Sequence, residues 1–181
     1  IKGVGPATAE RIVEKFGADS FDVIQNTPED LASIKGISIE KAMNISEEYK
    51  KQFGIRDLML MLSPYQVSLE KCISIFQALG TKAGEKIKQN PYVLCEDSID
   101  LPFEKVEAIA FALGVSADNE LRLAAGVEYI LRKNLLNGHT CLPRKKLIPV
   151  ASSLLESDEI RIGNICDKMI ANLRIRSKMV D

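Results

Sequence analysis

The sequence predicts a mainly α-helical fold: an array of short helices, followed by a segment in which helices alternate with short strands. The composition is rich in Ala, Leu, Lys and Glu, which favour helix, while aromatic residues make up only 6%. Apolar residues recur at helical spacing, and Gly, Pro and N-cap residues punctuate them at short intervals. Short helices with short connections indicate a compact helical array.

The first part of the chain contains closely spaced helix boundaries. Pro6 opens a helix that Gly17 closes, and a short segment around residues 21–24 follows. The run Thr27–Asp30 supplies an N-cap, a proline at the first helical position and acids in the first turn, and this short helix ends at Gly36. Further helices are expected over residues 38–52, 55–62, 68–80, 81–90 and 103–113.

The pattern changes after about residue 115. Expected there are a helix over residues 119–136, a strand at HTCL (139–142), helices over 143–155 and 160–173, and a strand at RIRSKMVD (174–181). This is the element order of a winged-helix domain, whose wing would need another strand beyond Asp181. The predicted divisions are residues 1–56, 57–115 and 116–181, the last a truncated winged-helix-like domain. The chain has no initiator methionine and is expected to begin inside a longer protein.

The charge is unevenly distributed, although the net charge is only −1. Residues 57–120 carry five Lys or Arg against ten Asp or Glu, a net of −5, whereas residues 121–181 carry eleven against six, a net of +5. Two interpretations stay open: local electrostatic attraction to a partner, or ordinary solvated faces.

The cysteines and the histidine do not indicate a metal site or a catalytic site. Cys72, Cys95, Cys141 and Cys166 form no C-x-x-C pair, and His139 is the only histidine. Reduced, mostly buried cysteines in a cytoplasmic protein are expected, with no metal and no catalytic residue. No apolar run approaches the roughly 18 residues of a membrane span, and no signal peptide is visible.

A short internal repeat carries the main functional information. The opening IKGVG returns as IKGIS at Ile34–Ser38, and an offset of 33 residues aligns the two copies. Ankyrin repeats have a similar period, but their Thr-Pro-Leu-His signature is absent and only two copies are found. The aligned pairs are Ile1 with Ile34, Lys2 with Lys35, Gly3 with Gly36, Val4 with Ile37, Ala9 with Ala42, Ile12 with Ile45, and Phe16 with Tyr49.

A Gly-apolar-Gly turn between two helices can bind an anion. The first glycine can adopt a positive φ, the apolar residue anchors the turn, and the second glycine permits close approach to free amides at the next helix N-terminus. Pro6 has no N–H to donate, but its two successors do, and the preceding lysine adds positive charge. The candidate anion-binding residues are Lys2, Gly3, Val4, Gly5, Ala7, Thr8, Lys35, Gly36, Ile37 and Ser38.

These two copies resemble the helix-hairpin-helix motif, which binds the DNA backbone without reading sequence. IKGVGPATAERIVEKFG resembles its second half, and PEDLASIKGISIEKAMNISEEYKKQF resembles the whole motif. Ser38 occupies the position where the motif has its second glycine. Its Cβ would hinder the approach of a phosphate, or its hydroxyl would cap the helix or bind the phosphate. Both copies could also be αα-hairpin turns without a ligand. In a third, degenerate copy, Asp100-Leu101-Pro102 replaces Gly-apolar-Gly, which predicts packing and not binding.

The chain as a whole resembles the N-terminal region of RecD-like (RecD/TraA-type, superfamily 1) ATP-dependent DNA helicases. The resemblance rests on the tandem hairpins, on IRDLMLMLSPYQVSLEKCISIFQALGTKAGEKIKQNPYVL and on NGHTCLPRKKL, in that order. It implies an exodeoxyribonuclease V alpha-like parent that acts in DNA repair and recombination. In that family the motor follows this region, and the phosphate loop GxxxxGK[ST] is absent here. ATP and Mg are therefore expected only in the motor, with no cofactor in these residues.

The remaining polar candidates are weaker. Arg144, Lys145 and Lys146 oppose the dipole of the helix they open, which indicates either a secondary phosphate contact or a solvated basic face. His139 is expected in a structural turn, and Cys141 is expected to pack inward from the predicted strand. Two other functions stay open: a helix-hairpin-helix module of another DNA repair enzyme, and a protein–protein interaction array.

Overall fold

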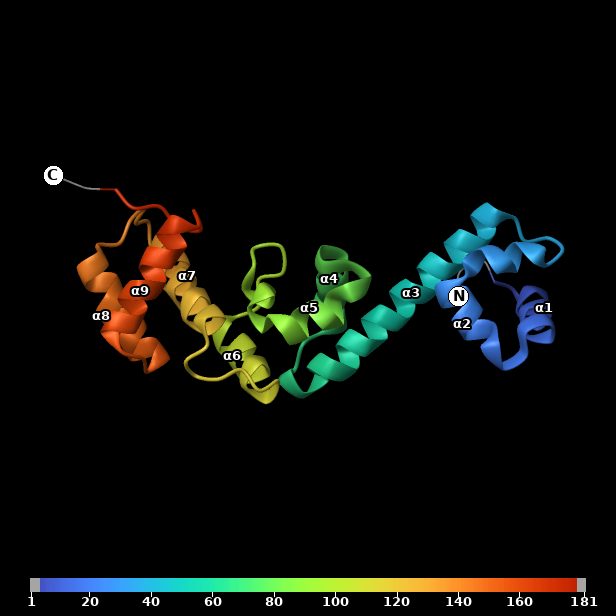
Figure 1. Ribbon diagram of the computed structural model, residues 1–181, viewed down its shortest axis with the longest axis horizontal. Helices are drawn as coiled ribbons and strands as arrows, with labels where there is room; N and C mark the ends of the chain where they lie inside the picture. Colours follow the sequence, from blue (N-terminus) through green and yellow to red (C-terminus); the bar gives the residue numbers. More distant parts are fainter. Residues whose placement is uncertain (1–3, 179–181) are drawn as a thin grey trace. The chain divides into compact units, whose positions relative to one another are not determined.

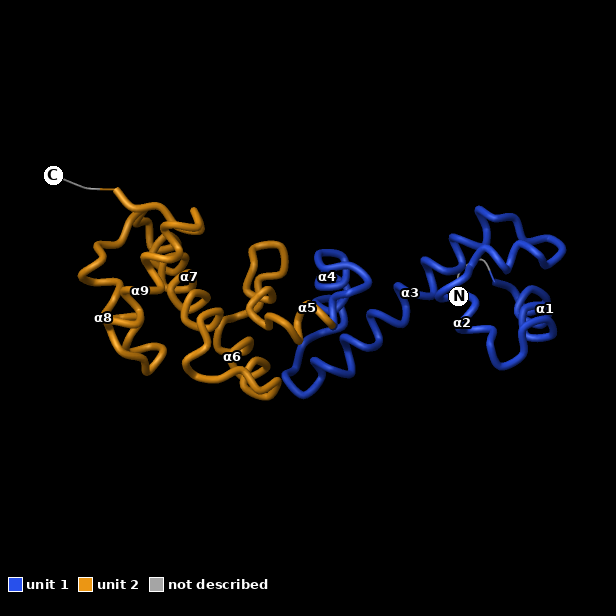
Figure 2. The backbone as a smooth tube through the Cα atoms, in the orientation of Figure 1, with its two compact units in different colours: residues 1–84 blue, residues 85–181 orange. Residues whose placement is uncertain are grey.

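The computed structural model describes residues 4–178, and these residues form two compact units that divide between Gly84 and Glu85 (Figure 2). The first unit contains α1 (Pro6–Phe16), η1 (Gly17–Asp19), α2 (Ser20–Asn26), η2 (Pro28–Ser33), α3 (Ile39–Leu62), η3 (Ser63–Tyr65), α4 (Leu69–Leu79) and η4 (Gly80–Lys82) (Figure 1). α5 (Ala83–Gln89) crosses the division, and η5 (Pro91–Cys95), α6 (Phe103–Ala112), α7 (Glu120–Leu136), α8 (Arg144–Leu155) and α9 (Glu159–Ala171) follow. The expected helical character is confirmed.

The predicted strands are wrong, and with them the winged-helix-like segment. Within residues 4–178 the structure contains no strand. The segment 139–142 is irregular, and Asn134 in α7 donates its side-chain amide to the carbonyls of His139 and Cys141, at 3.3 and 3.1 Å. Residues 174–178 are also irregular, and residues 179–181 lie outside the described part.

The two helices predicted over residues 38–52 and 55–62 are one continuous helix, α3. Gly54 lies inside it and does not end it. A Cβ at Gly54 would lie 2.3 Å from Cε2 of Phe76 in α4, so the missing side chain makes room for a ring of the neighbouring helix. α3 also runs across the division predicted between residues 56 and 57, and the three-part division stays a prediction.

The core of the second unit is built around α7. Its fully buried side chains include Leu123 and Val127 of α7, Val106 and Ile109 of α6, Leu155 of α8 and Ile162 of α9. α7 contacts α6, α8, α9 and η5, so the helices after Glu85 pack on one central element. Among residues 4–178, no helix combines the length and the apolar character that crossing a membrane requires.

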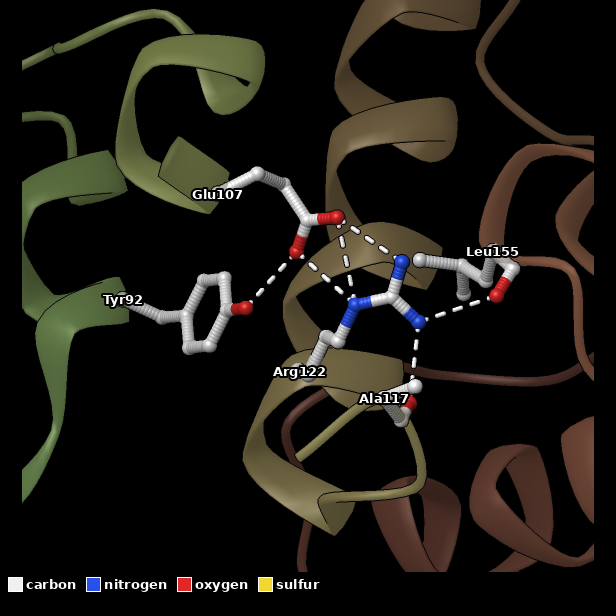
Figure 3. A network of polar contacts seen from close by, with 5 residues as sticks. All are labelled: Tyr92, Glu107, Ala117, Arg122 and Leu155. Atoms are coloured by element: carbon white, nitrogen blue, oxygen red, sulfur yellow. Dashed lines mark hydrogen bonds and ion pairs between the residues drawn. The ribbon is translucent and has the colours of Figure 1, made fainter. Parts of the chain in front are cut away.

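A buried ion pair and its hydrogen-bond partners connect five segments of the second unit (Figure 3). The guanidinium of Arg122, which is 5% exposed, donates to both carboxylate oxygens of Glu107, with Nη2 2.8 Å from Oε2. Its Nη1 donates to the carbonyls of Ala117 and Leu155, each at 2.9 Å. Tyr92 donates its hydroxyl to Glu107 at 2.7 Å, and burial, together with this carboxylate, raises the pKa of Tyr92. The Arg122 guanidinium thus ties α6, the α6–α7 loop and the end of α8 to α7.

The cysteines differ in exposure. Cys72 and Cys166 are buried, as expected, and burial raises the pKa of both thiols. Burial raises the pKa of Cys95 to about 12. The expectation that Cys141 packs inward is wrong, because residues 139–142 form no strand and this side chain is exposed.

We therefore expect a thiol reagent to modify Cys141 first in the folded chain. Only the thiolate is nucleophilic, and a raised pKa lowers its fraction at pH 8 in the three other cysteines. Mass spectrometry after brief alkylation at pH 8 would identify the modified position, and a Cys141→Ser variant should lose the fast phase. Equal rates at Cys141 and Cys72 would contradict this expectation.

Candidate nucleic-acid interface

The two copies of the repeat share one hydrophobic core. Ile12 of the first copy is buried in the same cluster as Ile37 and Ile45 of the second, and Val4 packs against that cluster. The cluster also contains Ile24, Leu31, Ile34, Ala42 and Tyr49. The start of α1 and the start of α3 are therefore fixed by the same buried side chains, although they lie 33 residues apart.

The first bend leads into α1. Lys2 and Gly3 lie outside the described residues. Gly5 is the exposed N-cap, with φ −77° and ψ 169°, and no side chain caps the helix. The Gly5 carbonyl accepts from the amides of Thr8 and Ala9, both at 3.0 Å. The Thr8 amide is thus already used in the helix, whereas the Ala7 amide stands at the second helical position, where a helix supplies no acceptor.

The second bend leads into α3 and lies at the surface. Gly36 has φ +89°, a conformation that favours glycine, and its Ile37 neighbour is 6% exposed and anchors the bend. Lys35, Gly36 and Ser38 are exposed. The Ser38 hydroxyl accepts from the Lys41 amide at 3.2 Å, so this serine caps the helix. The amides of the first two residues of α3, Ile39 and Glu40, have no acceptor within the helix.

Two cations of α1 contact the segment that forms the second bend, and neither was predicted from the sequence. Arg11 donates Nη1 to the Lys35 carbonyl at 3.1 Å. Lys15 donates Nζ to the carbonyl and the hydroxyl of Ser33, at 3.1 and 2.6 Å. Their spacing of four residues places Arg11 and Lys15 on one face of α1, and this spacing is the one sequence signal that could have identified them as a pair. Arg11, Lys15 and Lys35 together place positive charge around the bend, beside the positive end of the α3 dipole.

A bend of the same pattern, with a positive φ two residues before a helix N-cap, occurs at two more places. Gln66 has φ +54° and is followed by Val67 and by Ser68, whose hydroxyl accepts from the Lys71 amide at 3.2 Å, as Ser38 does from Lys41. This bend was not predicted, although SLEKC at residues 68–72 parallels SIEKA at residues 38–42.

The degenerate copy adopts this bend as well. Asp100 has φ +54°, Leu101 is 6% exposed, and Pro102 is the N-cap of α6. The buried leucine fits the packing role predicted for this copy, and the proline offers no amide.

The basic cluster at the start of α8 divides into two kinds of residue. Arg144 forms a bidentate ion pair with Asp167 and also donates to the Gly163 carbonyl at 3.1 Å. The hydrogen bonds between the two side chains raise the pKa of Arg144 and lower that of Asp167. Lys145 and Lys146 are exposed. Among the described residues, no three His, Cys, Asp or Glu side chains gather as a metal site requires.

Comparison with known proteins gives matches to two families and to curated relatives, one of which is described below. Residues 51–141 match the family described as the ATP-dependent RecD2 DNA helicase HHH domain, where HHH stands for helix-hairpin-helix. Residues 1–51 match the SAM-like helix-hairpin-helix tandem. The ATP-dependent RecD2 DNA helicase of Deinococcus radiodurans is 24% identical over 147 residues, which are 81% of this chain and 20% of that protein. The chain thus spans about a fifth of the length of this relative, and no solved structure matches.

Proposed function

Because the chain belongs to the RecD2 DNA helicase family, in which it matches the helix-hairpin-helix region, we propose that it is a DNA-binding part of an ATP-dependent RecD-like helicase. In this proposal it binds DNA without sequence specificity. One observation carries this proposal: the two surface bends at the starts of α1 and α3 are fixed by one apolar core. A rigid pair of helix N-termini can hold two phosphates at a set spacing, which two independent loops could not do.

The chemistry of the contact follows from the bends themselves. At the first bend a phosphate oxygen accepts hydrogen bonds from the backbone amides near Gly5 and Ala7, where no side chain lies between the phosphate and the backbone. At the second bend it accepts from the amides of Ile39 and Glu40, beside Lys35 and Arg11. These donors meet only the sugar–phosphate backbone, so they position the duplex and read no base.

In this proposal, the ATP-dependent helicase activity of the family belongs to other parts of the protein. The motor, with its ATP and Mg²⁺, lies outside residues 1–181, and these residues take no cofactor and carry no catalytic group. Lys145 and Lys146 provide a secondary contact, while Arg144 holds Asp167. The setting is DNA repair and recombination in the cytoplasm, where the free cysteines of this chain stay reduced.

Gly5→Val is expected to weaken DNA binding about tenfold, the equivalent of one charge-assisted hydrogen bond. The backbone of Gly5 is extended and no atom lies within 4 Å of a Cβ built there, so the valine fills only the space that a phosphate would occupy. Fluorescence anisotropy with a labelled duplex would measure the Kd. For the unaltered chain we expect a Kd on the order of 10⁻⁴–10⁻⁶ M at physiological salt and a log–log salt slope of roughly −2 to −4.

Gly84→Val is the matched control, because a Cβ at Gly84 also meets no atom within 4 Å, and it belongs to α5 and to neither bend. Its affinity should equal that of the unaltered chain. Two results would refute the proposal: no duplex binding by the unaltered chain at low salt, or equal affinity in the Gly5→Val variant.

A further inference from the structure

Three aromatic rings form a row on the surface of the first unit. The ring centroids of Phe21 in α2 and Tyr49 in α3 lie 5.8 Å apart at an interplanar angle of 24°, and those of Tyr49 and Phe53 lie 4.2 Å apart at 31°. Tyr49 is 6% exposed, whereas Phe21 and Phe53 are 60% and 39% exposed. The middle ring is therefore buried and the two flanking rings face solvent.

The row is anchored to the core that fixes the two bends. Tyr49 belongs to the same buried cluster as Ile12, Ile37 and Ile45. Contact with a buried ring restricts the motion of Phe21 and Phe53, so their exposed surfaces are held in place. Exposed aromatic side chains that are held in place lose little further entropy when a flat partner stacks on them.

Three cations lie on the α3 side of the row, whereas the α2 side carries Asp22 next to Phe21. The segment YKKQFGIR at residues 49–56 contains Lys50, Lys51 and Arg56, and no carboxylate lies between Glu48 and Asp57. At helical spacing, Lys50 and Arg56 lie three residues before and after Phe53, on its side of α3, and Asp57 lies there too, four residues after it. Alternating aromatic and basic side chains suit a flexible polyanion that carries flat rings.

We propose that Phe21 and Phe53 stack with unpaired bases of a DNA strand while Lys50 and Arg56 contact its phosphates. The inference rests on the proposed function, because the strand is the one that the bends hold. Tyr49 lies 11 residues after Ser38, about 16 Å along α3 at 1.5 Å per residue. At the duplex spacing of 3.4 Å per phosphate this corresponds to roughly five nucleotides. The first unit thereby binds paired DNA at its bends and unpaired DNA at its rings.

The absence of tryptophan from the chain allows a direct test. In a Phe21→Trp variant, the single indole should stack on a base, and its fluorescence should be quenched by oligothymidine of roughly 15 nucleotides. A Phe21→Leu/Phe53→Leu variant keeps apolar volume but loses the ring faces. It should bind this oligothymidine roughly 5- to 100-fold more weakly and bind blunt duplex as before, measured by anisotropy at low salt.

Leu136→Ala is the control for loss of exposed apolar surface, because Leu136 is 87% exposed and lies in the second unit; its binding should not change. Unquenched indole at saturating oligothymidine, or equal oligothymidine affinity in the double leucine variant, would overturn the stacking inference. If the proposed phosphate binding at the bends is wrong, this is seen separately, because the unaltered chain then does not bind duplex DNA. If the unaltered chain binds duplex and these ring tests fail, the proposed function stands and the stacking inference falls.

Discussion

Replacement of Arg122 by methionine is expected to lower the free energy of unfolding of the second unit by about 3–5 kcal/mol, as is typical when one partner of a buried ion pair is removed. Methionine fills much of the same space, so the loss is one of hydrogen bonds and charge. The variant leaves the Glu107 carboxylate, whose side chain is 16% exposed, without its cation. It also leaves the carbonyls of Ala117 and Leu155 without their Arg122 donor (Figure 3).

Arg161→Met is the matched control. Arg161 also forms an ion pair, with Asp118, but the two side chains are 49% and 69% exposed. Exposed pairs contribute about 0–1 kcal/mol, so this variant should remain near the unaltered stability. Hydrogen exchange of the amides in α7 and α8, measured against urea concentration, gives the free energy of this unit separately from the first. Similar losses in the two variants would contradict the assigned role of Arg122.

Gly126→Val is expected to destabilise the second unit by about 2–3 kcal/mol through overpacking. A Cβ at Gly126 would lie 2.5 Å from Cδ2 and 2.8 Å from Cδ1 of Leu155. Leu155 is 1% exposed and its carbonyl is held by Arg122, so its side chain has little room to withdraw. Arg122 and Gly126 lie one turn apart on α7, and both face Leu155, the last residue of α8. Arg122 donates to the Leu155 carbonyl, and the missing side chain of Gly126 makes room for the Leu155 side chain.

Two further variants separate the clash with Leu155 from the general effect of replacing a glycine inside a helix. Gly84→Ala lies in α5, where a Cβ meets nothing within 4 Å, and it should stabilise by about 0.5–1 kcal/mol. Adding Leu155→Ala to Gly126→Val removes the clashing atoms, so the double variant should lose less than the sum of the two single losses. Additive losses, measured by the same hydrogen exchange, would show that Gly126 and Leu155 do not conflict.

The helix-hairpin-helix assignment could be predicted from the sequence because its determinants are local. Helix starts at Ser38 and Ser68 were predicted at residues that can cap the next turn, and both hydroxyls do accept the amide three residues later. The repeat required only a comparison of the chain with itself. Where such local evidence was over-extended, as with the strands expected at residues 139–142 and 174–178, the prediction was wrong, because a strand requires a partner elsewhere in the chain.

Local sequence alone therefore determined the helices, their caps and the positions of the two bends. The tertiary structure decided whether Gly54 ends a helix, which arginine is buried, and which cations reach the second bend. Each of these depends on atoms distant in sequence: Phe76 for Gly54, Glu107 and Leu155 for Arg122, and Lys35 for Arg11. Capping and helical periodicity act over about four residues, whereas burial and ion pairing depend on which helices meet, and that is settled only when the chain has packed.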